Sequence, residues 1–310
     1  MKNLQTQTEA LDFLNHFNLL ANQVVEGFIS GIHKSPFHGF SSEFAEHKIY
    51  NPGESTKNID WKVYAKTDKL YVKTYDDETN LRCHIIFDNS SSMHYPKTNA
   101  NQVFPANKIQ YAALMAAALL KLIKKQRDAA GLTIFSDKID FTTKEQGNER
   151  HHNLLIEQLN LVCFSTPKKA QTNIAETLHL IAEKIHKRSL IIIFSDMFSA
   201  NTQTQALLQA LQHLKHNKHK VVLFHVLDKK TEMDFNFEAE AKKFVDLETG
   251  EVINIHTDLL QETYKTLAQK QVQKTIELCK QYQIDYIMSD INENMQKNLV
   301  TYLIEKQKFK

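Results

Sequence analysis

The chain has 310 residues, of which 42% are hydrophobic and 24% charged, and its 38 basic and 36 acidic residues leave a formal net charge of +2. This composition is too apolar for a disordered chain, and 7 Gly and 5 Pro are too few for a fibrous one. Because acidic residues nearly balance basic ones, charge gives no general reason to expect binding to nucleic acid or to an anionic membrane. We therefore expect a globular protein that binds no nucleic acid.

The cysteines and the apolar segments indicate where the protein resides. Cys83, Cys163 and Cys279 are far apart and show no metal-ligand or redox spacing, which favours three reduced thiols. The N-terminus lacks the apolar core of a signal peptide. The longest apolar stretch, from Tyr111 to Ile123, is too short to span a bilayer. These features predict a soluble, cytoplasmic protein without a membrane span.

Residues 1–80 are expected to form an N-terminal helix followed by a small β-rich subdomain. Apolar residues recur at spacings of three and four between Leu11 and Phe28, which indicates one face of a helix. A turn-rich stretch follows, and then the segments 58–64 and 70–75 alternate apolar and polar residues, which predicts two short strands.

Residues 81–310 show apolar strands that alternate with helices. The predicted strands are 84–88, 131–135, 189–194, 221–226 and 284–288, and the predicted helices are 106–126, 154–161, 173–187, 204–216, 258–282 and 293–305. Near-continuous apolar strands separated by helices are typical of a parallel sheet covered on both faces. We therefore expect an α/β domain with a doubly wound, mostly parallel sheet, and a β-hairpin insertion near residues 241–256.

Polar residues follow the predicted strands at the edge where such sheets bind ligands. Asp88, Ser90 and Ser92 come directly after the first strand, Thr172 precedes a helix, and Asp196 follows the strand 189–194. Carboxylate and hydroxyl oxygens suit Mg²⁺ or Mn²⁺, and no thiolate or imidazole cluster competes for zinc. The sequence thus predicts a divalent metal site of five residues, for which Thr166 is an alternative to Thr172.

Each of these residues also has an ordinary structural explanation. Asp and Ser favour strand-end turns, and Thr172 or Asp196 would serve as the N-cap of the helix that follows it. A D-x-S-x-S match alone is weak, since it arises by chance in roughly one chain of this length in ten. Its position after the first strand of the sheet supports the metal site.

The histidines suggest no second site. His213, His216 and His219 fall three residues apart, but neighbouring lysines would repel a metal ion, so we expect a solvated basic helix end. His151 and His152 are likewise expected at the surface.

Two families resemble this sequence. The motif Asp88-x-Ser90-x-Ser92-Met93 is similar to the metal-ion-dependent adhesion site of von Willebrand factor A domains. That resemblance implies Ser90, Ser92 and Thr172 as hydroxyl ligands and Asp88 and Asp196 as carboxylates that often act through water. It also implies that a carboxylate of the binding partner completes the metal shell.

The narrower resemblance is to the domain-of-unknown-function fifty-eight family. It is carried by Tyr50-Asn-Pro-Gly-Glu54, Ile59-Asp-Trp61, Leu70-Tyr-Val-Lys, the motif at Asp88, Gly131-Leu-Thr-Ile-Phe-Ser136 and Asp246-Leu-Glu-Thr-Gly250. At two positions the sequence departs from the family's pattern: Glu54 stands where the family usually has Asp, and Lys66 stands where Arg is common. Members often accompany MoxR-type AAA+ ATPases and are thought to act with them in protein assembly or maturation. The resemblance therefore implies a MoxR-associated, chaperone-like role.

We expect a non-catalytic, metal-dependent protein-interaction module. The first alternative is a Mg²⁺-dependent phosphohydrolase with Asp88 as nucleophile, which is disfavoured because Ser90 stands where a nearby acid–base carboxylate would be needed. The chain also lacks a Walker-type lysine loop and an HExxH motif. The second alternative is a scaffold that binds no metal.

Overall fold

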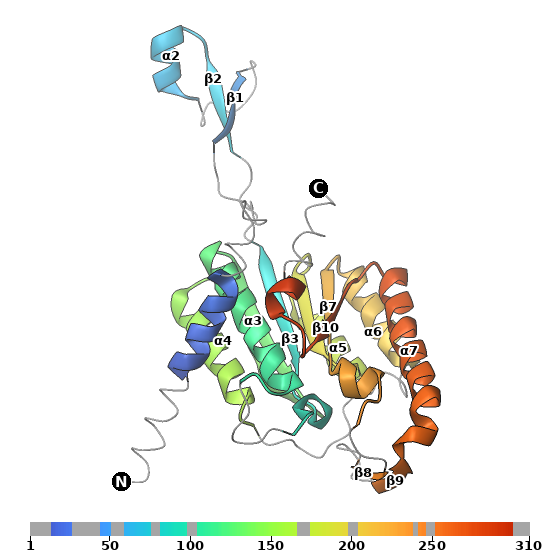
Figure 1. Ribbon diagram of the computed structural model, residues 1–310. Coiled ribbons are helices and arrows are strands. Elements are labelled where there is room, and N and C mark those ends of the chain that lie inside the picture. The colour runs from blue at the N-terminus through green and yellow to red at the C-terminus, as the bar shows by residue number, and fades with distance from the viewer. Residues whose placement is uncertain are drawn as a thin grey trace. The chain divides into compact units, whose positions relative to one another are not determined.

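The computed structural model describes residues 14–26, 44–50, 59–75, 81–97, 104–165, 174–197, 204–237, 241–245 and 252–299 (Figure 1). The chain divides into a small unit, Phe37–Asn80, and a large unit that comprises Met1–Pro36 and Leu81–Lys310. The helix at residues 14–26 belongs to the large unit, where the Phe17 ring packs edge-on against Phe104 at a centroid distance of 6.2 Å. This division differs from the expected one, in which the N-terminal helix and the small β-rich subdomain share residues 1–80.

A six-stranded sheet forms the centre of the large unit, in the order β10-β7-β6-β3-β4-β5. All neighbouring strands run parallel except the edge pair of β4 and β5. The strands are β3 (Arg82–Asp88), β4 (Ala129–Phe135), β5 (Ile139–Thr142), β6 (Leu190–Ser195), β7 (Lys220–Leu227) and β10 (Asp285–Asp290). The central strands are buried on both faces, which explains their continuous apolar runs. The predicted fold class is confirmed.

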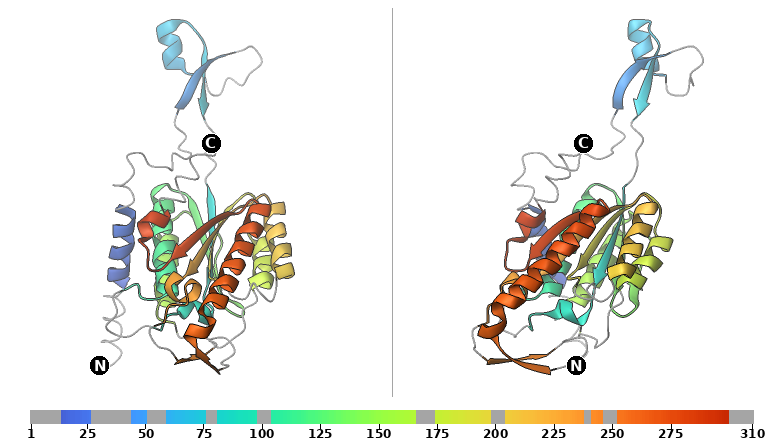
Figure 2. Two further views of the ribbon diagram at one scale, coloured as in Figure 1. Left: turned by 45° about the vertical axis from the view of Figure 1, so that its right-hand side comes forward. Right: turned by 90° about the vertical axis from the view of Figure 1, so that its right-hand side faces the viewer.

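Helices cover both faces of this sheet (Figures 1 and 2). One face is covered by α5 (Ile174–Lys184), α6 (Thr204–His216) and α7 (Thr257–Gln281), which share a buried apolar cluster with alternate residues of β6 and β7. The other face carries α3 (Lys108–Lys125), α4 (Glu149–Val162) and the helix at 14–26. The alanines of α3 are fully buried, so this helix lies close to the sheet.

The strand order places a topological switch between β3 and β6. From β3 the chain winds outward to β4 and β5, whereas from β6 it winds in the opposite direction to β7 and β10. The loops that follow β3 and β6 therefore diverge at the carboxyl edge of the sheet, where doubly wound proteins bind ligands. The motif that begins at Asp88 and the Ser195–Asp196 pair both lie at this edge.

An insertion lies between β7 and α7. It begins with a single π-helical turn, η4 (Lys229–Met233), and continues to an antiparallel pair of strands, β8 (Ala241–Val245) and β9 (Val252–His256). The pair coincides with the segment for which the sequence predicts a hairpin. Two hydrogen bonds connect η4 to the end of β10. The Lys229 backbone N–H donates to the Asp290 carboxylate, and the Asn292 side-chain amide donates to the Asp228 carboxylate.

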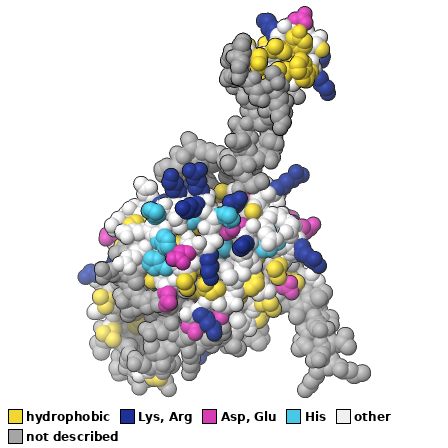
Figure 3. Space-filling model, turned by 180° about the vertical axis from the view of Figure 1, so that it is seen from behind, with side chains coloured by type: hydrophobic (Ala, Val, Ile, Leu, Met, Phe, Trp, Pro, Cys, Tyr) yellow, Lys and Arg dark blue, Asp and Glu magenta, His cyan; other side chains and the backbone are white. Residues whose placement is uncertain are grey.

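In its described residues the small unit contains two antiparallel strands, β1 (Phe44–Ile49) and β2 (Tyr71–Tyr75), and one short helix, α2 (Trp61–Thr67). Apolar side chains gather on one side of it (Figure 3). The prediction of a strand at 58–64 is wrong, because Asp60 caps a helix there. Its carboxylate accepts the backbone N–H groups of Lys62 and Val63 at 2.9 and 3.2 Å.

Three histidines differ from the expectation of a solvated position. His151 and His152 lie in α4 and donate to backbone carbonyl oxygens of Ala130 and Asp128, at 3.0 and 3.3 Å. His219 is buried directly before β7, and its Nδ1 accepts the Ser189 N–H. Other histidines do lie among Lys and Arg side chains on the surface (Figure 3). In the part of the chain that the structure describes, no helix is long and apolar enough to cross a bilayer.

Candidate metal centre

The loop after β3 brings one carboxylate and two hydroxyls together. Asp88 is the last residue of β3, and its Oδ1 accepts the Ser90 backbone N–H at 2.9 Å. The Ser90 and Ser92 hydroxyl oxygens are 3.0 Å apart and both side chains are buried. Adjacent oxygen ligands of an octahedral Mg²⁺ ion, each about 2.1 Å from the metal, lie about 3 Å from each other. The two hydroxyls hydrogen-bond to each other, and the same spacing would also suit a pair of metal ligands.

Strand β6 supplies the second carboxylate. The pairing of Phe87 with Phe194 sets Asp88 beside the end of β6, where the Ser195 hydroxyl donates to Asp88 Oδ2 at 2.7 Å. Ser195 Oγ also accepts the Met197 N–H at 3.0 Å, so it fixes both the carboxylate and the start of the next loop. Asp196 follows directly and is 8% exposed.

The two carboxylates lie close enough to interact unfavourably. Burial raises the pKa of Asp88 to about 6, and the neighbouring Asp196 carboxylate contributes to this rise, while hydrogen bonds from Ser195 and Ser90 partly oppose the shift. A buried pair of like charges costs free energy unless a cation balances it. The protein thus maintains at this edge a negative charge that a divalent cation would compensate.

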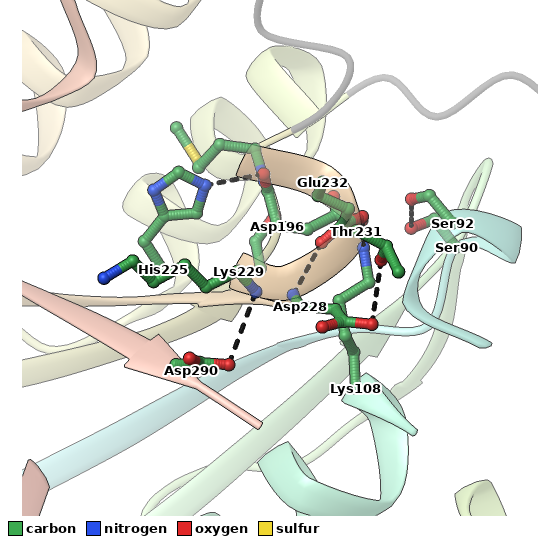
Figure 4. A network of polar contacts seen from close by, with 12 residues as sticks. Ser90, Ser92, Lys108, Asp196, His225, Asp228, Lys229, Thr231, Glu232 and Asp290 are labelled. Atoms are coloured by element: carbon green, nitrogen blue, oxygen red, sulfur yellow. Dashed lines mark hydrogen bonds and ion pairs between the residues drawn. The ribbon is translucent and has the colours of Figure 1, made fainter. Parts of the chain in front are cut away.

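Lys108 lies inside the same cluster. Its Nζ contacts Asp196 Oδ2 at 2.8 Å and Glu232 Oε1 at 2.6 Å, and its side chain is fully buried (Figure 4). Burial alone would lower the pKa of Lys108, but the Asp196 and Glu232 carboxylates outweigh it and hold the pKa above its ordinary value. The ammonium group therefore remains charged. When all three carboxylates are ionised, they and the ammonium together carry a formal charge of −2.

Two elements place Lys108 and Glu232 in the centre. Lys108 is the first residue of α3, a helix capped by the Asn107 side chain, which accepts the Gln110 N–H at 3.0 Å. Glu232 belongs to η4, and its second oxygen accepts the Asp228 N–H at 2.7 Å. Burial raises the pKa of Glu232, and Lys108 opposes that shift. Sequence reasoning missed both residues, because neither stands next to a recognised motif.

The predicted ligands are brought together as far as the structure describes them. Asp88, Ser90, Ser92 and Asp196 converge at one edge, whereas Thr172 and the alternative Thr166 lie outside the described residues. Among the described residues, no group of three or more His, Cys, Asp or Glu could hold a metal ion. A metal here would therefore depend on hydroxyl oxygens, which suits a hard cation such as Mg²⁺ or Mn²⁺ and disfavours zinc.

Several proteins are similar to this chain. The uncharacterized proteins Rv1480 of Mycobacterium tuberculosis (strain H37Rv) and Mb1516 of Mycobacterium bovis are each 21% identical over 215 residues, 69% of this chain and 64% of the relative. The chain thus spans 64% of the length of the curated relatives that it matches. Solved structures with a similar fold include BatB from Bacteroides thetaiotaomicron, with 18% identity, a TM-score of 0.46, and coverage of 74% of this chain and 100% of that one.

A further solved structure is a von Willebrand factor type A domain from Catenulispora acidiphila, with 13% identity, a TM-score of 0.33, and coverage of 51% of this chain and 34% of that one. The family model described as "Protein of unknown function DUF58" matches residues 46–274, which include most of the small unit and the whole centre around Asp88, Lys108, Asp196 and Glu232. This chain belongs to the DUF58 family.

Proposed function

We propose that this chain is a non-catalytic protein-interaction module that binds a carboxylate of its partner through a divalent metal ion. Asp88, Ser90, Ser92 and Asp196 would hold Mg²⁺ or Mn²⁺, with Thr172 as a fifth residue. The ion supplies a fixed positive charge, and a partner's Asp or Glu completes its oxygen shell. The observation that carries the proposal is the buried pair of carboxylates at the topological switch, with two hydroxyls at ligand spacing beside it.

Charge supports the same reading. With Lys108 included, the cluster carries a formal charge of −2, which is the charge that one divalent cation neutralises. Lys108 Nζ contacts Oδ2 of Asp196, and we propose that the same carboxylate also binds a water molecule of the metal shell. Lys108 would then orient Asp196 and limit the repulsion within the site before the ion binds.

The biological partner is proposed from the family resemblance. We propose that the module acts in the cytoplasm with a MoxR-type AAA+ ATPase or with a client of that ATPase, in the assembly or maturation of other proteins. A pull-down from native lysate with Mg²⁺ should recover such an ATPase, and a chelator should release it. If the ATPase is recovered equally with and without the chelator, the two proteins bind each other without the metal ion.

Metal binding is tested directly by thermal unfolding with Mg²⁺, Mn²⁺ or EDTA. An ion at one hundred times its dissociation constant should stabilise the protein by about 2.7 kcal/mol. Asp88→Asn should abolish this effect, whereas Asp285→Asn, at the opposite edge of the sheet, should retain it. An equal response of both variants would contradict the site. Phosphate release that depends on Asp88 would contradict a non-catalytic role.

A further inference from the structure

A pocket of about 380 Å³ opens beside the candidate metal centre, between the ends of β6 and β7, the turn η4 and one side of α7. Its floor is apolar and buried, formed by Met197, Leu227 and Val272. Its rim includes Tyr264 and Leu267, whose side chains are 36% and 60% exposed. Asp196 lines the pocket and also belongs to the centre, so the two sites are continuous.

Three polar residues that line this pocket, Asp196, Glu232 and His225, already have partners within the protein. Asp196 and Glu232 both contact the Lys108 ammonium. The His225 Nε2 lies 2.9 Å from the Asp196 carbonyl oxygen, and its Nδ1 lies 2.7 Å from the Tyr286 hydroxyl. Burial lowers the pKa of His225 to about 4, so the ring is neutral at physiological pH.

The pocket does not suit an anion. None of its lining residues, all of which lie in the described part of the chain, is Lys or Arg, and the carboxylates at its edge would repel a negative group. A partner carboxylate would therefore bind the metal outside the pocket, and an uncharged group would enter it.

Aromatic contacts support one side of the rim. The Tyr264 ring packs on Phe235 at a centroid distance of 4.4 Å, and Phe235 packs edge-on against Phe237 at 5.0 Å. These aromatic contacts link the rim on α7 to the insertion after η4. The methionines Met197 and Met233 adapt readily to apolar side chains of different outline.

We propose that this pocket binds a large apolar side chain, such as Leu, Met or Phe, that stands within three positions of the metal-binding carboxylate in the partner. The inference rests on the proposed function and adds a sequence requirement to it. The short spacing follows because Asp196 belongs to both sites, so the acidic and the apolar side chain bind next to each other. Burial of one large apolar side chain contributes about tenfold or more to affinity.

The test is a selection of random peptides displayed on phage against the immobilised chain in Mg²⁺, with elution by EDTA. Eluted peptides should carry an Asp or Glu with a large apolar residue within three positions. Synthetic peptides with that apolar residue replaced by Ala should bind about tenfold or more weakly.

Ala268 lies on the α7 side of the pocket, so Ala268→Leu fills it without touching the metal centre. This variant should still enrich acidic peptides but lose the preference for an apolar neighbour. Gln269→Leu, exposed on the same helix and outside the pocket, should behave as the wild type.

The outcomes distinguish the two proposals. If the selected peptides are acidic but have no apolar neighbour, or have Lys or Arg in that position, the proposal for the pocket is wrong while the metal-dependent function stands. An unchanged apolar preference in Ala268→Leu overturns it as well. If the wild type yields no acidic peptides that EDTA elutes, the proposed function fails and this inference fails with it.

Discussion

Replacement of Asp88 by Asn should stabilise the metal-free protein. The pKa of Asp88 is raised from 3.8 to about 6 by burial and by Asp196, so the folded protein holds the carboxyl proton more tightly than the unfolded chain. Between about pH 4 and pH 6 the folded state binds more protons, and the free energy of unfolding therefore falls as pH rises through this window. A shift of about two pKa units corresponds to about 3 kcal/mol above pH 6.

The neutral amide that Asp88→Asn introduces would avoid this cost and keep most of the local geometry. Its oxygen can accept the Ser90 N–H, but the Ser195 hydroxyl loses its carboxylate acceptor, a loss of about 1 kcal/mol. We therefore expect Asp88→Asn to be more stable by about 2 kcal/mol at pH 8 in EDTA, and the difference to shrink towards pH 4.

Urea unfolding at several pH values measures the difference, with Asp285→Asn as the control for loss of one carboxylate. In excess Mg²⁺ the order should reverse, because only the wild type gains the free energy of metal binding. A variant that is less stable than the wild type at pH 8 in EDTA, or equally stabilised at pH 4 and pH 8, would refute the account of the buried carboxylate pair.

Further variants probe the surroundings of the centre. Lys108→Met should destabilise the protein by about 3–5 kcal/mol, because it leaves Asp196 buried without its ammonium partner. Lys124→Met, which removes a partly exposed ion pair, should cost less than about 1 kcal/mol in the same urea titration, and similar losses in both would contradict the role of Lys108. Gly131→Ala should cost about 1–3 kcal/mol, since its Cβ would lie 2.7 Å from His84 Nδ1. An unchanged urea midpoint in that variant would show that the His84 ring moves away freely.

The parallel sheet could be predicted because each of its central strands has a pattern that is visible within a few consecutive residues. Each central strand is a short apolar run, and the burial of β3, β6 and β7 on both faces requires that pattern. The candidate ligands Asp88 and Asp196 could be placed for the same reason, since each lies where such a run ends. The edge strand β5 escaped prediction because four residues that alternate between partly exposed and exposed give too short a signal.

Other features depend on contacts that the sequence does not reveal locally. The alternation at 58–64 fitted a strand, but the Asp60 side chain satisfies two backbone N–H groups and so favours α2. His152 was expected at the surface, yet α4 extends further towards its N-terminus than its apolar periodicity indicates and turns this side chain inward. Lys108 begins an apolar helix, and its carboxylate partners lie 88 and 124 residues further along the chain.

These sequence separations also affect when the centre can form. A chain that emerges from the ribosome presents Lys108 long before Asp196 and Glu232, and each contact closes a loop of 88 or 124 residues. Until η4 has been synthesised and has reached the sheet edge, the buried ammonium lacks one of its two carboxylate partners, so this part of the sheet edge should be among the last regions to become ordered. In a nascent chain that ends before Glu232, the Lys108 ammonium lacks one of its two carboxylate partners, so ordering of this cluster would report that synthesis has passed η4.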